Sequence, residues 1–212
     1  MPIDAFFDGL ITCHDATRGE KIFGSMHGYH GAAGKKPCEQ RGGLFSYMTR
    51  HPVTRMDSYI VMMADLYLRD QGEPIPNEAV PERLANPRSE QERRDLWTIF
   101  SEGCDSFFYY DRELFLACGA ELGIKTEELV NSPAYFRASV WPRITNSLEL
   151  TDEYLRDIYG IGRIGVHRKR PVSWQNAWAG WPDSYRGELW RQFERYEMKQ
   201  VANAFDYQMS LT

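Results

Sequence analysis

Residues 44–59 constrain the fold more than any other stretch of this chain. Residues 44–48 are rich in strand-forming side chains, which predicts a short strand. Pro52 cannot continue a central strand and disfavours helical geometry at the residue before it, so the chain must turn there. Thr54 with Asp57 three residues later resembles a capping box that starts a helix. The apolar face of that helix recurs at helical spacing, at Ile60, Met63, Ala64 and Tyr67.

The corner between the predicted strand and helix is positively charged. Arg50 follows the strand, and Arg55 lies near the start of the helix. Unpaired backbone N–H groups, the positive end of the helix dipole and nearby cations together favour an anion. The corner is therefore a candidate phosphate site, and the alternative is a corner whose arginines are simply solvated.

The pattern of Arg50, Pro52, Arg55 and Ser58 resembles the segment by which sulfotransferases hold the 3′-phosphate of their donor, 3′-phosphoadenylyl sulfate. In that family, the arginine at the strand end and the serine in the helix bind this phosphate. The resemblance gives these roles to Arg50 and Ser58, with Arg55 beside them. It implies that the donor is a co-substrate and that no metal is required.

A second patch of the resemblance lies upstream. Residues 21–26 are predicted to form a strand, which ends at His27. In many sulfotransferases, a histidine at such a strand end is the general base for the acceptor hydroxyl, and imidazole suits this task because it titrates near neutrality. His27 matches best in position, and His30 is the near alternative. Either could instead be a loop histidine bonded to backbone.

The third patch is residues 167–178, His-Arg-Lys-Arg-Pro-Val-Ser-Trp-Gln-Asn-Ala-Trp. It resembles a C-terminal sulfotransferase segment whose basic part folds over the 3′-phosphate, a role that falls to Arg168 and Lys169, and less closely to Arg170. Three adjacent cations repel one another unless an anion or solvent relieves them. A solvated charge run is the alternative.

The chain departs from the sulfotransferase pattern at its N-terminus. A loop for the 5′-phosphosulfate is expected there, and only Thr17-Arg18-Gly19 hints at one, without the glycine spacing that lets backbone amides surround an oxyanion. The loop could be rebuilt from Arg18, Lys21 or Lys35. Otherwise the chain is truncated or degenerate, which favours an inactive binding or assembly protein.

A different function class follows from possible metal ligands in the first part of the chain. They are His14, His27, His30 and Cys38, with Asp15 as a further candidate. Zinc favours such donors, but close pairs with fixed spacing are missing. The glycine-rich run at residues 31–36 fails the P-loop spacing and is more simply a solvated basic loop.

Composition indicates one ordinary globular domain over residues 1–212. The net charge of −5 argues against a general nucleic-acid or membrane binder. Four widely spaced cysteines without a CxxC pair indicate reduced thiols. No apolar run is long enough to span a bilayer, and no signal peptide is recognisable, so a cytoplasmic protein is expected.

The other segments are assigned from caps, breakers and periodicity. Helices are predicted over residues 89–103, 112–122, 148–159 and 184–205, with a short capped turn at 126–130. Proline-rich residues 69–88 are predicted to form a surface loop or lid, and residues 131–146 an irregular stretch.

Together these features predict an α/β fold: a small parallel sheet flanked by helices in a P-loop-like sulfotransferase architecture, with a helix-rich C-terminal half. The implied activity is transfer of a sulfuryl group from 3′-phosphoadenylyl sulfate to a hydroxyl or amine of a small molecule or glycan. The alternatives are an inactive relative and, more remotely, a metal-dependent hydrolase. The acceptor and the oligomeric state stay open.

Overall fold

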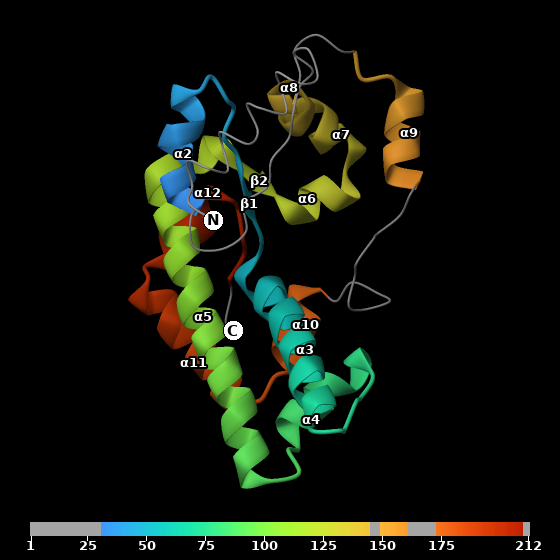
Figure 1. Ribbon diagram of the computed structural model, residues 1–212, viewed down its shortest axis with the longest axis vertical. Helices are drawn as coiled ribbons and strands as arrows, with labels where there is room; N and C mark the ends of the chain where they lie inside the picture. Colours follow the sequence, from blue (N-terminus) through green and yellow to red (C-terminus); the bar gives the residue numbers. More distant parts are fainter. Residues whose placement is uncertain (1–30, 145–148, 161–172, 210–212) are drawn as a thin grey trace.

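The computed structural model describes residues 31–144, 149–160 and 173–209, and these residues are mostly helical (Figure 1). The first half contains α2 (Gly31–Gln40), β1 (Tyr47–Thr49), α3 (Pro52–Asp70), η1 (Asn77–Ala79), α4 (Val80–Ala85) and α5 (Glu90–Cys118). The second half contains η2 (Ala120–Leu122), β2 (Gly123–Lys125), α6 (Thr126–Asn131), α7 (Pro133–Tyr135), η3 (Phe136–Val140), α8 (Trp141–Ile144), α9 (Asp152–Gly160), α10 (Trp174–Gly180), α11 (Asp183–Arg195) and α12 (Met198–Ala204).

The core is built around α5, which rises from the lower end of the view to the level of α2 and packs against α2, α3, α11 and α12 (Figure 1). Its inward stripe is formed by Leu96, Phe100, Cys104 and Phe108, all fully buried. These positions follow the i, i+4 spacing that places side chains on one helix face. The predicted apolar stripe of this helix is confirmed at Leu96 and Phe100, while Ile99 is partly buried.

One long helix replaces the two that were predicted over residues 89–103 and 112–122. Its start is confirmed, because the Ser89 hydroxyl accepts the backbone N–H of Glu92 at 3.1 Å. The helix continues through Gly103, where an added Cβ would lie 2.2 Å from a ring carbon of Tyr59, so glycine lets α3 and α5 approach closely. It ends at Gly119, whose φ of 74° is left-handed.

The predicted fold class is wrong: the described residues do not form a sheet flanked by helices in a P-loop-like sulfotransferase architecture. Their sheet has two strands of three residues each, β1 and β2, which pair in parallel. A larger parallel sheet needs strands with continuous apolar runs. Met48 in β1 is exposed, and β2 offers only Ile124 between Gly123 and Lys125, so helices bury the apolar surface instead.

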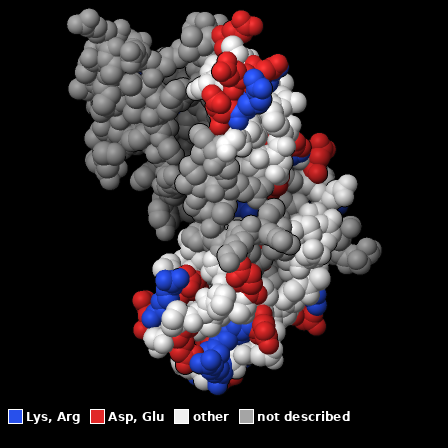
Figure 2. Space-filling model, turned by 90° about the vertical axis from the view of Figure 1, so that its right-hand side faces the viewer, with Lys and Arg blue, Asp and Glu red and all other residues white. Residues whose placement is uncertain are grey.

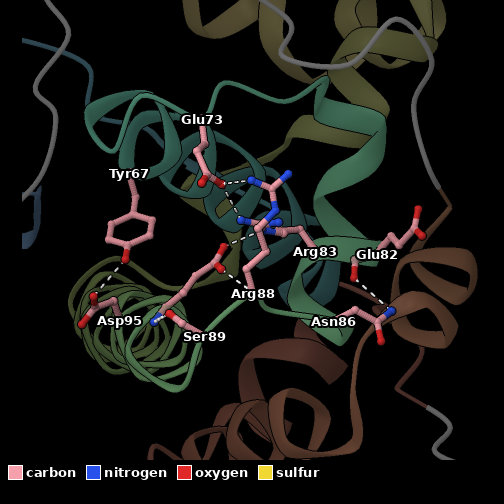
Figure 3. Close-up of polar contacts among 9 residues, drawn as sticks. Tyr67, Glu73, Glu82, Arg83, Asn86, Arg88, Ser89 and Asp95 are labelled. Atoms are coloured by element: carbon pink, nitrogen blue, oxygen red, sulfur yellow. Dashed lines mark hydrogen bonds and ion pairs between the residues drawn. The ribbon is translucent and has the colours of Figure 1, made fainter.

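The proline-rich segment 69–88 is not a simple loop. It forms η1 and α4, and α4 buries Val80 and Leu84. Figure 3 shows Arg83 and Arg88 pointing at Glu73, and Arg83 also bonds Glu92 of α5 with 2.5 Å between Nε and Oε1. The Arg83 side chain is 11% exposed, so this paired cation fastens α4 to α5.

Residues 31–36, predicted to be a solvated basic loop, lie instead in the helix α2. Residues predicted to be irregular at 131–146 form α7, η3 and α8 within their described part. The helix predicted at 148–159 is α9, capped by the Thr151 hydroxyl on the N–H of Tyr154. The helix predicted at 184–205 is split into α11 and α12 by Glu197, whose φ of 52° breaks helical geometry.

Charge is mixed among the described residues on one face of the molecule (Figure 2). On the face shown in Figure 2, basic and acidic side chains lie beside one another at the lower end, without a broad field of one sign. Binding of an anion on this face must therefore depend on a local arrangement of groups. No helix within the described ranges is long and apolar enough to cross a membrane.

Candidate functional site

The candidate site lies at the carboxyl edge of the parallel pair, where β1 and β2 both end. In open parallel sheets this is the edge at which ligands bind. Arg50 and His51 follow β1, and Thr126 and Glu127 follow β2. The Thr126 hydroxyl donates to the carbonyl oxygen of Thr49 at 2.9 Å, which ties the two strand ends together.

Glu127 is the carboxylate at the centre of this edge. Its Oε1 accepts the backbone N–H of His51 at 2.9 Å and the Thr54 hydroxyl at 3.0 Å. The same oxygen lies 3.8 Å from Nε of Arg50, and the Tyr207 hydroxyl donates to Oε2 at 3.4 Å. The Arg50 and Glu127 side chains are 37% and 35% exposed, so solvent reaches this group of charges.

His51 is the buried hinge between β1 and α3, and it caps α3 in place of Thr54, the residue predicted for that role. Its Nδ1 accepts the N–H of Val53 at 3.2 Å, which leaves the proton on Nε2 to donate to the carbonyl oxygen of Gln208 at 3.0 Å. The ring also lies edge-on to Tyr207, with 5.5 Å between centroids. Burial lowers the pKa of His51, opposed by the Gln208 carbonyl and the Glu127 carboxylate.

We expect the protein to lose stability as the pH falls below about 6.5, the pKa of an unfolded histidine. Because the folded pKa of His51 is lowered, the unfolded chain binds the proton more readily. The contribution is fully present above the unfolded pKa and is lost as pH falls through the folded pKa, at up to about 1.4 kcal/mol per pH unit. Urea unfolding measures the free energy of unfolding of wild type and His51→Gln from about pH 7.5 to about pH 5. The difference between their pH slopes is the contribution of His51, because the other titrating groups are the same in both proteins. Equal pH slopes in the two proteins would contradict the assignment.

Two of the three patches that carry the resemblance meet at this edge. Trp174, in the third patch, begins α10, and α10 packs against α3 (Figure 1). Its ring stacks on His51, with 5.0 Å between centroids and 15° between planes. The described end of segment 167–178 therefore lies at the start of the helix that follows Arg50.

Of the three predicted donor-binding residues within the described ranges, two lie in this region. Arg50 is at the strand edge, and half-buried Ser58 lies one turn beyond Thr54 on the same face of α3. Arg55 instead pairs with the buried carboxylate of Asp111, and its guanidinium lies 4.3 Å from the centroid of the Phe107 ring. Arg55 is therefore a packing residue of the α3–α5 interface.

The other predicted site residues lie outside the described ranges. They are Arg18, His27, His30, Arg168 and Lys169. Lys35, considered for the phosphate loop, donates to the carbonyl oxygen of Ala117 at 2.9 Å and so caps the end of α5. Of the candidate metal ligands, Cys38 is on α2, and His14, Asp15, His27 and His30 are not described. Among described residues, no group of three or more His, Cys, Asp and Glu could hold a metal.

Sequence reasoning missed Glu127, Tyr207 and the capping role of His51. The signal for Glu127 was the run Thr126-Glu127-Glu128 directly after β2, because polar residues that follow parallel strands meet at one edge. A three-residue strand with a glycine and a lysine gives too little periodicity to be recognised.

An open hollow of about 580 Å³, formed by residues that follow or end α12, lies next to the site. It is lined by Asn203, Asp206, Tyr207, Gln208 and Met209. Tyr207 and Gln208 also bond Glu127 and His51, so the hollow and the strand edge share a wall.

Comparisons with protein-family models, with curated proteins and with solved structures find no match to this chain. Its function must be inferred from the residues at the strand edge and from the three patches of the sequence.

Proposed function

We propose that this chain binds 3′-phosphoadenylyl sulfate through its 3′-phosphate at the carboxyl edge of β1 and β2, and that it transfers the sulfuryl group to a hydroxyl or amine. The observation that carries the proposal is the placement of Arg50 between the end of a parallel strand and the start of α3, beside the described end of segment 167–178. No sulfotransferase sheet is needed for this local arrangement.

The edge has the chemistry that a phosphate requires. The N-terminus of α3, a helix of 19 residues, carries a positive dipole end. Arg50 is partly exposed and offers a guanidinium, whose fork of N–H groups matches phosphate oxygens. The Thr54 hydroxyl lies 3.0 Å from both Glu127 Oε1 and the His51 carbonyl oxygen, so its single proton can turn toward an anion at the helix start. Ser58 extends the same face by one turn. Together they supply charge and directed donors for one phosphate.

In the proposed reaction, the acceptor oxygen or nitrogen attacks sulfur and the bond from sulfur to the bridging phosphate oxygen breaks. Adenosine 3′,5′-bisphosphate leaves, and a base takes the acceptor proton. His27, or His30 in its place, is the proposed base, and Arg168 and Lys169 are proposed to cover the 3′-phosphate. Arg50 and Ser58 anchor the donor, which positions the sulfur for attack.

The second candidate function is a binding or assembly protein that holds the nucleotide without turnover. The N-terminal sequence favours it, because Thr17-Arg18-Gly19 lacks the spacing of a phosphosulfate loop. Both candidates predict binding of adenosine 3′,5′-bisphosphate, and only the first predicts transfer of labelled sulfate to an acceptor. A cytoplasmic location is part of the proposal, since Cys104 and Cys118 are buried thiols outside any disulfide.

Arg50→Ala should weaken binding of adenosine 3′,5′-bisphosphate about 10- to 100-fold, because charged hydrogen bonds to the phosphate are lost. Calorimetric titration measures the dissociation constant, and adenosine 5′-monophosphate serves as the ligand control for the 3′-phosphate. Arg69→Ala is the matched protein control, because this exposed arginine lies at the opposite end of α3 and pairs with Asp65. Unchanged affinity in Arg50→Ala, or equal binding of the two nucleotides, would remove the basis of the proposal.

A further inference from the structure

The carboxylate of Glu127 lies among groups at the proposed phosphate site. One oxygen, Oε1, lies 2.9 Å from the backbone nitrogen of His51, 3.0 Å from Oγ1 of Thr54 and 3.8 Å from Nε of Arg50. Arg50 and Thr54 are groups that the proposed function assigns to the 3′-phosphate, and the His51 N–H lies beside them at the start of α3. Two anions cannot share them without strong repulsion.

Glu127 is held at this position but is not enclosed. It lies in the first turn of α6, its second oxygen meets the Tyr207 hydroxyl at 3.4 Å, and its side chain is 35% exposed. A carboxylate with this exposure can turn into solvent when a stronger anion arrives. The next residue, Glu128, differs in its partner: it lies 3.6 Å from Nζ of Lys125.

We propose that Glu127 is a built-in competitor of the donor phosphate: its carboxylate occupies the site when no donor is bound, and it lowers the affinity because the ligand must displace it. The proposal rests on the proposed donor site. Glu127 takes no part in bond making. The ligand then binds only those molecules in which the carboxylate has turned away. The observed affinity is therefore lower than the affinity of the open site itself.

The competitor role and a purely structural role predict changes of opposite sign. If Glu127 only fastens the strand edge to α3, its replacement loosens the site and weakens binding. If it competes, removal of its charge strengthens binding. Glu127→Gln separates the two, because the amide oxygen can still accept from His51 and Thr54 while the charge is lost.

The test is calorimetric titration of wild type, Glu127→Gln and the neighbouring control Glu128→Gln with adenosine 3′,5′-bisphosphate. We expect Glu127→Gln to bind about 3- to 10-fold more tightly and Glu128→Gln to change by less than about 2-fold. The gain should shrink as salt is raised, because it arises from charge. Inorganic phosphate serves as a second probe and should show the same order.

Equal or weaker binding by a folded Glu127→Gln protein, with wild type still binding, overturns this inference alone. No binding by any of the three proteins overturns the proposed function and this inference with it. If the glutamine variant does not fold, Glu127→Asp takes its place, since the shorter side chain withdraws the carboxylate from His51. Tighter binding by this variant supports competition, and equal or weaker binding overturns it.

Discussion

Arg55→Met should lower the free energy of unfolding by about 3–5 kcal/mol, the cost of breaking a buried ion pair from one side. Arg55 pairs with Asp111, whose side chain is 10% exposed, and it also covers the Phe107 ring. Burial already raises the pKa of Asp111 while the Arg55 guanidinium lowers it. Without the guanidinium the carboxyl group must stay charged in the core or take up a proton, and either outcome destabilises the fold.

Urea unfolding measures this loss, and two variants control it. Arg112→Met removes a neighbouring arginine whose side chain is 35% exposed and whose partners are Glu113 and Glu197, so it should cost less than about 1 kcal/mol. Arg55→Met combined with Asp111→Leu removes both charges and should recover much of the loss. A single variant as stable as wild type would show that the pair does not hold α3 to α5.

Arg55→Met also tests whether Arg55 contributes to nucleotide binding or only to packing. Where it is still folded, Arg55→Met should bind adenosine 3′,5′-bisphosphate with nearly wild-type affinity, in contrast to Arg50→Ala. Sequence reasoning placed both arginines at the phosphate because they flank one strand–helix corner. Their surroundings differ: Arg50 precedes α3 and lies at the strand edge, whereas Arg55, in the first turn of α3, faces α5.

Local signals in the sequence were sufficient for several elements. Ser89 and Glu92 predicted the start of α5, and Pro52 placed the turn before α3. These signals act over three or four residues, through a hydrogen bond or a fixed φ, so tertiary packing does not alter them. The position of Arg50 after a short strand follows from the same kind of evidence.

The fold class and half of the site depended on contacts between distant segments. Gly103 reads as a helix breaker until Tyr59 of α3 is placed against it. Glu127 belongs to the site only because β2 pairs with β1, and their three-residue strands carry little pattern of their own. Sequence reasoning assumed a sheet to receive the apolar residues, and the helices around α5 bury them instead.

Phe100→Ala should cost about 3–5 kcal/mol, because it removes a large side chain from the centre of that helical core. Phe100 is fully buried, and its ring meets Trp181 at 5.2 Å and Tyr185 at 4.8 Å between centroids, both with edge contacts. Such aromatic pairs add to the area buried. For a chain of 212 residues we expect the melting temperature to fall by roughly 10 °C.

Thr98→Ala on the same helix is the matched control, since Thr98 is exposed and should change stability by less than about 0.5 kcal/mol. The contacts of Phe100 also predict which helices Phe100→Ala should destabilise most. Trp181 lies at the end of α10 and Tyr185 in α11, so the cavity loosens the helix whose first residue, Trp174, stacks on His51. Hydrogen exchange should therefore rise in α10 and α11 more than in α9, which packs elsewhere (Figure 1). A uniform rise over all helices, or none, would mean that α5 does not support the strand edge through this aromatic cluster.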